Sequence, residues 1–293
     1  SGQFLRRRMS KTLLRAVQAV DHGDRIVMGP YLFGITHAAA GIHPRKTMLV
    51  PCLHDESFAH LSVMGDLFRS VGGLMFNSEP ERDLACRLYA LQPARCSVVG
   101  MGINPFTADP KAFADRRGLQ SPYVIYSGRR EPLKGTPLLL DYMSAFRNRT
   151  GRDVKLVVTG SGSMNVPPEL APHMLDVGFL DPKEKFDAMA GAVAFCHPSR
   201  NESFSIVIME SWLAGTPVIV TSGSEVMRYH CLKSNGGLWF RSYPEFEEEL
   251  CLLLDNAELR AALGKAGRDY VLKEYSWSKI QDKLFTALDA SVP

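Results

Sequence analysis

Two glutamates, Glu202 and Glu210, stand eight positions apart in RNESFSIVIMESW, a stretch otherwise rich in apolar residues. Carboxylates are among the side chains least often buried without a partner, so the pair needs either structural partners or a ligand. If the stretch is helical, the two glutamates are separated by a rise of roughly 12 Å along the helix axis. Their side chains then leave the helix in directions that differ by about 80°. Both carboxylates can then face one cleft, where an extended ligand with two sets of hydroxyls would suit them.

The residues between the two glutamates predict a helix that starts soon after a strand. PSRNES ends the strand, and FSIVIMESWLAG continues as a helix. The free N–H groups at Phe204, Ser205 and Ile206 would then be a seat for phosphate or sugar oxygens. The alternative is that Glu202 only complements the helix dipole, while Glu210 pairs with an arginine.

Two further stretches place polar or small residues directly after predicted strands. In YSGRREPLKG the strand ends at Gly128, and Arg129 and Lys134 follow in a basic turn. Ligands bind at such strand ends in open α/β folds, and these two cations could neutralise a diphosphate. Gly160 in VVTGSGS occupies a similar position, although a plain tight turn explains it equally well. A solvated basic loop is the alternative for the first stretch.

His54 and Asp55 follow a predicted buried strand in VPCLHDES. An imidazole there could donate to a substrate oxygen, with Asp55 orienting it or binding a hydroxyl; a structural role is the alternative. In FNSEPERDL, Ser78 is the expected helix cap, with Pro80 in the first turn and Glu81 three residues after the cap. Capping explains this stretch without a catalytic role.

The overall composition excludes several classes of protein. The 293 residues are 45% hydrophobic and carry a formal net charge of +3, which does not indicate a nucleic-acid partner. The six cysteines form no C-x-x-C pair, so a reduced, cytoplasmic protein without thiolate-bound metal is expected. No Asp-x-Asp and no His/Cys cluster with metal spacing occurs, and no divalent ion is required.

The start of the chain, FLRRRMSKTLLRAVQAV (residues 4–20), predicts a basic amphipathic helix. Such a helix could lie on the surface of the first domain or make peripheral contact with the cytoplasmic face of a membrane. No apolar run approaches the ~20 residues of a membrane span.

Short apolar runs alternate with amphipathic segments, which predicts parallel sheets covered by helices on both faces. The expected strands are 47–53, 73–78, 96–100, 123–128, 154–160, 192–199 and 216–222. The expected helices include 79–90, 135–149, 182–190, 204–214 and 275–290. A segment rich in Pro, Asp and Gly divides the chain into a first domain (1–104), a linker (105–121), a second domain (122–275) and a terminal helix (276–293).

Taken in order, these stretches resemble the family-4 retaining glycosyltransferases of the GT-B fold, the glycosyl transferases group 1. GRREPLKG is similar to the family's Gly-Arg-x(4)-Lys-Gly loop, which implies that Arg129 and Lys134 bind the donor diphosphate. PSRNESFSIVIMESWLAGTPVIV is similar to its E-x(7)-E region, which implies that Glu202 contacts the donor sugar and Glu210 the ribose. PCLHDE implies that His54 is an active-site histidine.

The resemblance covers about residues 47–290, with further matches in NSEPERDL, VVGMGINPF and YSWSKI. It implies two Rossmann-like domains facing across a cleft, and metal-independent transfer of a hexose, with retention, from a nucleotide diphosphate sugar. The acceptor would be a hydroxyl of a glycan, a lipid-linked molecule or a small molecule, and no cofactor is implied.

Two departures from the family are visible. Ser203-Phe204-Ser205 stands where the family has Gly-Phe-Gly, which bears on the choice of donor. The strand and Gly-rich loop with which the family begins are not visible either, so we expect an incomplete N-terminal domain. A second polypeptide could complete that domain, or the chain could be a shortened member. A non-catalytic nucleotide-sugar-binding or scaffolding subunit and a nucleotide-sugar epimerase of the same fold are the alternative functions.

Overall fold

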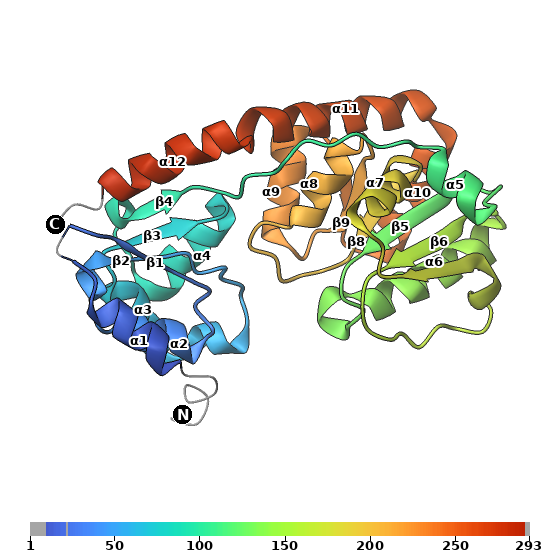
Figure 1. The fold of residues 1–293 in the computed structure, drawn as a ribbon. Coiled ribbons are helices and arrows are strands. Elements are labelled where there is room, and N and C mark those ends of the chain that lie inside the picture. Colours follow the sequence, from blue (N-terminus) through green and yellow to red (C-terminus); the bar gives the residue numbers. More distant parts are fainter. Residues whose placement is uncertain (1–9, 22, 291–293) are drawn as a thin grey trace. The chain divides into compact units, whose positions relative to one another are not determined.

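The computed structural model describes residues 10–21 and 23–290 of the chain, and these form two compact units (Figure 1). Unit 1 contains the described residues up to Gly102, the segment Glu202–Phe204, and the described residues from Trp277 onward. Unit 2 contains Ile103–Asn201 and Ser205–Ser276. Each unit has its own parallel sheet, which confirms the α/β class predicted from the alternating pattern.

The sheet of unit 1 has four parallel strands in the order β1-β2-β3-β4. The strands are β1 (Ile26–Met28), β2 (Thr47–Leu49), β3 (Gly73–Phe76) and β4 (Cys96–Val98). The helices are α1 (Lys11–Gln18), α2 (Gly34–Ala40), α3 (Ser62–Ser70), α4 (Glu79–Tyr89) and α12 (Trp277–Asp289). Helix α4 begins as predicted, because the Ser78 hydroxyl accepts a hydrogen bond from the Glu81 N–H (3.3 Å) and Pro80 occupies the first turn.

The sheet of unit 2 has six parallel strands in the order β10-β9-β8-β5-β6-β7. The strands are β5 (Tyr123–Ser127), β6 (Lys155–Thr159), β7 (Met174–Gly178), β8 (Ala194–His197), β9 (Val218–Thr221) and β10 (Gly237–Phe240). The helices are α5 (Ala112–Arg117), α6 (Thr136–Thr150), α7 (Pro182–Ala190), α8 (Ile206–Leu213), α9 (Glu225–Ser234), α10 (Tyr243–Asp255) and α11 (Ala257–Glu274). Since β5 pairs with both β6 and β8, the strand order reverses between β5 and β8.

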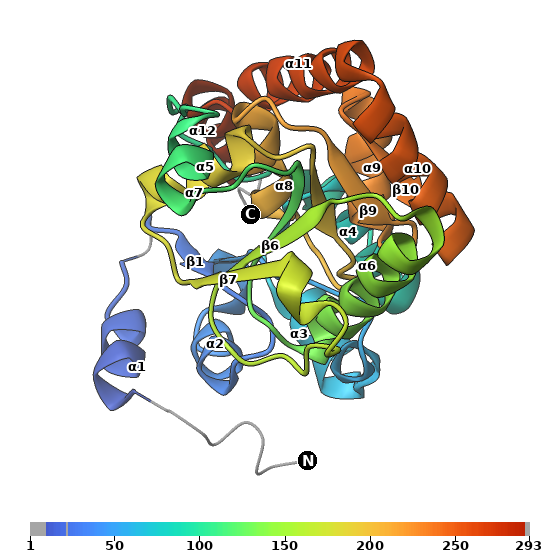
Figure 2. The same cartoon turned by 90° about the vertical axis from the view of Figure 1, so that its right-hand side faces the viewer.

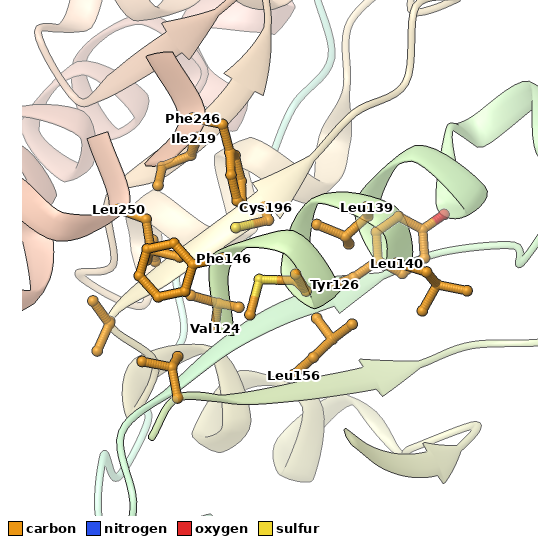
Figure 3. Close-up of a cluster of buried hydrophobic side chains, with 14 of the residues drawn as sticks. Val124, Tyr126, Leu139, Leu140, Phe146, Leu156, Cys196, Ile219, Phe246 and Leu250 are labelled. Atoms are coloured by element: carbon orange, nitrogen blue, oxygen red, sulfur yellow. The ribbon is translucent and has the colours of Figure 1, made fainter. Parts of the chain in front are cut away.

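Helices cover both faces of the sheet of unit 2. Helices α6 and α10 pack against one another beside the sheet (Figure 2). Figure 3 shows Phe146 of α6 and Leu250 of α10 gathered with Val124 of β5 in one buried cluster. The next strand residue, Ile125, is equally buried, and α8 packs on β8 and β9. Burial on both faces explains why these strands read as continuous apolar runs.

Each of the seven predicted strands contains an observed strand, but the sequence reasoning missed β1, β7 and β10. Strand β1 is an apolar run of only three residues, and β7 is partly exposed and is interrupted by Asp176. The helix predicted from residue 204 begins at Ile206, because Ser205 has a left-handed backbone with a φ of 65°. Helix α5 lies within the segment predicted as a linker.

The N-terminal helix predicted for residues 4–20 is described only in part, as α1 from Lys11 to Gln18. Ser10 caps it by accepting a hydrogen bond from the Leu13 N–H (3.2 Å), and residues 4–9 lie outside the described part of the chain. In the described ranges 10–21 and 23–290, no helix combines the length and the apolar character needed to cross a membrane.

Candidate functional site

The loops that follow β5 and β8 meet where the strand order of unit 2 reverses. In open α/β sheets this position, outside the carboxyl ends of the strands, is where ligands bind. Gly135, at the end of the first loop, lies so close to the second loop that an added Cβ would stand 2.6 Å from the Pro198 carbonyl oxygen. The topology therefore brings the GRREPLKG stretch next to the residues that follow β8.

Gly128 and Gly160 bring together the main chains at the ends of β5 and β6. The Gly128 N–H donates to the Thr159 carbonyl oxygen (3.0 Å). A Cβ on Gly160 would stand 1.9 Å from the Gly128 carbonyl oxygen, and the φ of Gly160 is +128°, so only glycine fits. These two turns line a cavity of about 250 Å³, which we call the β5–β6 cavity. Its other lining residues include Arg129, Phe179, Leu180 and Lys185.

The two arginines that follow Gly128 have different environments. The side chain of Arg130 is only 7% exposed and donates to both carboxylate oxygens of Asp176 on β7 (2.6 and 2.5 Å). The side chain of Arg129 is 68% exposed and lies 3.2 Å from the Glu131 carboxylate. Arg130 therefore anchors the loop, and Arg129 is the arginine available to a ligand at the cavity. Sequence reasoning proposed Arg129 but did not identify Arg130 as its anchor.

Lys134 lies at the end of a short 3₁₀ helix, Pro132–Lys134, and is half-buried. Gly135 follows with a φ of +74°, and α6 begins at Thr136. Arg129 and Lys134 therefore lie at opposite ends of this loop. The loop is held at its start by the Arg130–Asp176 ion pair and at its end by α6.

Helix α8 begins directly after Ser205, which is buried in a left-handed conformation (φ 65°). This conformation is costly for any residue with a Cβ. The Ser205 hydroxyl has no hydrogen-bond partner among the described residues, and Ile206 is exposed. The first N–H groups of an α-helix lack intrahelical partners, so this end of α8 suits an anion.

Glu210 lies on α8 and pairs with Lys185 of α7. The Lys185 ammonium lies 2.7 Å from Glu210 Oε1, and the Glu210 side chain is 15% exposed. The other oxygen, Oε2, is buried and has no hydrogen-bond partner within the described ranges. Lys185 also lines the β5–β6 cavity, so the carboxylate is linked to that cavity through its partner. As an alternative to ligand binding, the sequence suggested that Glu210 pairs with an arginine. That prediction is wrong, because the paired cation is a lysine.

Glu202 and Phe204 belong to unit 1, whereas Ser205 and Glu210 belong to unit 2. Glu202 is half-buried and Phe204 is fully buried. Within unit 1, the Ser78 hydroxyl donates to the carbonyl oxygen of Ser203 (2.9 Å). The expectation that Glu202 and Glu210 face one cleft stays a prediction.

His54 lies in unit 1, in the loop after β2, and is half-buried. Its Nδ1 atom lies 3.7 Å from Glu56 Oε1, and the same oxygen accepts a hydrogen bond from the Tyr31 hydroxyl (2.9 Å). Asp55 pairs instead with His60, at 2.9 Å between Oδ1 and Nε2. The carboxylate beside His54 is therefore Glu56, a residue that sequence reasoning missed, and no pattern in HDES distinguished it from Asp55.

Glu81 does more than close the capping box predicted for α4. It is fully buried, and its two oxygens accept hydrogen bonds from the N–H groups of Leu53 and Asn77, each at 2.6 Å. Leu53 precedes His54 in the loop after β2, and Asn77 directly follows β3. One carboxyl group thus ties together the ends of two neighbouring strands.

Glu81 predicts a pH dependence of folding stability. Burial raises the pKa of Glu81 to about 8 from an ordinary value of 4.5, against the lowering effect of its N–H donors. Because the folded state then holds a proton that the unfolded state releases, the stabilisation is fully present below pH 4.5 and is lost as the pH rises through 8. Each unit of pKa difference corresponds to about 1.4 kcal/mol.

Urea unfolding between pH 5 and 9 checks this expectation. The stability of the wild type should fall across the range relative to that of Glu81→Gln, whose side chain stays neutral. Glu79→Gln, on the same helix turn, should follow the wild type. The prediction would be contradicted if the free energies of unfolding of the wild type and Glu81→Gln differed by the same amount at all pH values.

The described residues contain no group of three or more His, Cys, Asp or Glu side chains that could hold a metal ion. The charged residues that line the β5–β6 cavity are Arg129 and Lys185, and Lys185 also pairs with the carboxylate of Glu210. Such cations bind anions through charge-assisted hydrogen bonds.

The parallel sheets and the polar site at the reversal of strand order define the class of protein, an α/β protein with the Rossmann-like architecture of the GT-B fold. A family model described as glycosyl transferases group 1 matches residues 109–270. Because this match covers more than half of the chain, the chain belongs to the glycosyl transferases group 1 family.

Curated relatives carry glycosyltransferase names. A D-inositol 3-phosphate glycosyltransferase from Corynebacterium glutamicum is 28% identical over 226 residues, which cover 70% of this chain and 54% of the relative. A phosphatidyl-myo-inositol mannosyltransferase from Mycobacterium tuberculosis is 30% identical over 196 residues, covering 63% of this chain and 51% of the relative. The chain thus spans about half the length of these relatives.

Solved structures share the fold at low sequence identity. The Anabaena HepE protein in complex with UDP-glucose has a TM-score of 0.79 and 16% identity, and the match covers 95% of this chain and 81% of that protein. A sucrose-phosphate synthase from Thermosynechococcus elongatus has a TM-score of 0.77 and 17% identity, with 96% and 77% covered.

Proposed function

We propose that the protein is a retaining glycosyltransferase that moves a hexose from a nucleotide diphosphate sugar to a hydroxyl acceptor without a metal ion. The observation that carries the proposal is the carboxylate of Glu210. Its partner Lys185 lines the β5–β6 cavity, and its other oxygen is buried with no hydrogen-bond partner among the described residues. A buried acceptor of this kind calls for a hydroxyl donor, and a ribose diol supplies one.

The charged residues predicted for the donor site and His54 take separate roles in this proposal. Arg129 and Lys134 would stabilise the charge that develops on the departing diphosphate, an electrostatic contribution that is often the largest in such catalysis. The N-terminus of α8 would lie against the phosphates. Glu202 would orient the donor sugar and His54 would assist at the transferred group.

The family and the names of relatives support the choice of donor and of reaction. One neighbour of the same fold was solved with UDP-glucose, and two curated relatives are named for transfer to inositol-containing acceptors. We therefore propose a glycan, a lipid-linked molecule or a small polyol as the acceptor.

A thermal screen against nucleotide diphosphate sugars, with and without EDTA, tests the donor site. A matching donor at a hundred times its Kd should add about 2.7 kcal/mol to stability. The stabilisation should persist in EDTA and shrink in Arg129→Ala. The wild type should also transfer the sugar or hydrolyse the donor, and Glu202→Ala should lose this activity. The anomeric configuration of the product, compared with that of the donor, tests retention.

Stabilisation without turnover across an acceptor panel would identify a nucleotide-sugar-binding subunit instead. Conversion of the donor in the absence of any acceptor would identify an epimerase. Binding that EDTA abolishes and Mn²⁺ or Mg²⁺ restores would overturn the metal-independent mechanism.

A further inference from the structure

Lys185 is held in place on the side of α7 that meets α8. Its ammonium bonds Glu210 Oε1 at 2.7 Å and lies 4.8 Å from the centre of the Phe186 ring. Phe186 in turn stacks on Phe106 with 3.6 Å between ring centres. Only 23% of the Lys185 side chain is exposed, so the lysine is packed and paired at the same time.

The neighbouring lysine of α7 has a different environment. Lys183 pairs with Asp187 one turn further along the same helix, and its side chain is 62% exposed. Asp187 also accepts hydrogen bonds from the Asp109 N–H (2.8 Å) and from Arg116 (3.3 Å), so it keeps partners without Lys183. Helix α7 therefore offers one lysine to the cavity and one to solvent.

The Lys185–Glu210 pair leaves the carboxylate half satisfied. The ammonium holds Oε1, which restricts rotation of the carboxylate, while Oε2 is buried and has no hydrogen-bond partner in the part of the chain that the structure describes. A carboxylate with one oxygen fixed can accept from two adjacent hydroxyls in only a narrow range of orientations. A free carboxylate would accept from one hydroxyl almost as well as from two.

We propose that Lys185 is a positioning residue that sets Glu210 to accept from a ribose diol, and so makes the site select ribonucleotides over 2′-deoxyribonucleotides. The inference rests on the proposed function, because it deepens the role given there to Glu210. Lys185 acts through Glu210 and through the charge it places at the β5–β6 cavity.

Calorimetric titration of the full chain with UDP, GDP and ADP, and with the 2′-deoxy form of whichever binds, tests the proposal. Because one charge-assisted hydrogen bond is lost, Lys185→Ala should weaken binding of the ribose form about tenfold or more. The preference for ribose over deoxyribose should shrink toward unity in the same variant. Lys185→Arg should restore part of that preference, and Lys183→Ala should behave as the wild type.

The preference for ribose separates positioning from a purely structural role. Equal weakening of both sugar forms in Lys185→Ala, or wild-type binding by that variant, would overturn the proposal while leaving the donor site intact. If the wild-type chain binds none of the three diphosphates, the proposed function fails and this inference fails with it. Thermal unfolding of each variant confirms that the compared proteins are folded.

Discussion

Gly160→Ala is expected to lower transfer activity about 100-fold, since a misplacement of about 1 Å in a site can cost that much. The added Cβ would stand 1.9 Å from the Gly128 carbonyl oxygen, so the ends of β5 and β6 must move apart. The residue must also hold a φ of +128°, and the two effects together should destabilise folding on the order of 3 kcal/mol. A transfer assay measures the first loss and thermal unfolding the second, and nucleotide titration shows whether donor binding is affected.

The matched control for this substitution is Gly151→Ala. Gly151 also has a positive φ, +66°, but an added Cβ there would meet nothing within 4 Å. Its cost should be limited to about 1–2 kcal/mol of backbone strain, with nucleotide binding unchanged. Equal behaviour of the two variants would show that the close approach of Gly128 and Gly160 is not what shapes the cavity.

Arg130→Ala is expected to destabilise the chain by about 2 kcal/mol, because it removes two charge-assisted hydrogen bonds to Asp176. Arg130 is almost fully buried and bonds both oxygens of Asp176, and its loss also frees the loop that carries Arg129 and Lys134. Arg129→Ala should instead leave stability within about 0.5 kcal/mol of the wild type. That variant should weaken binding of a nucleoside diphosphate about tenfold, the loss of one charge-assisted contact.

Urea unfolding and nucleotide titration of both variants separate the two roles. The assigned roles would be wrong if Arg130→Ala kept its stability but lost nucleotide binding. The same holds if Arg129→Ala lost stability but kept nucleotide binding. Asp176→Asn should reproduce part of the stability loss of Arg130→Ala, because it removes the negative charge but keeps one acceptor oxygen.

The sequence predicted the architecture of unit 2 well where burial is two-sided. Strands such as β5 and β8 are covered on both faces, so their apolar runs are uninterrupted and easy to recognise. Strand β7 borders the sheet and carries Asp176 as the partner of Arg130, which breaks the apolar pattern. Its omission follows from a tertiary ion pair that no local window of sequence reveals.

The candidate site was predictable in its loops but not in its pairings. Motif order predicted that Arg129, Lys134 and Glu210 share one region, and the strand topology places the loops after β5 and β8 next to one another. The partner of Glu210 depends on how α7 packs on α8, and residue 185 has no distinguishing feature in the sequence. The same limit applies in unit 1, where Glu56 rather than Asp55 lies beside His54.

Glu81 has a consequence for how unit 1 can vary during evolution. Its two oxygens hold Leu53 and Asn77 at the same 2.6 Å, so the loops after β2 and β3 share one rigid bridge. A substitution that shifts either loop must be matched by a change in the other or at the bridge. Among homologues we therefore expect these two loops to change length and sequence together, as a covarying pair.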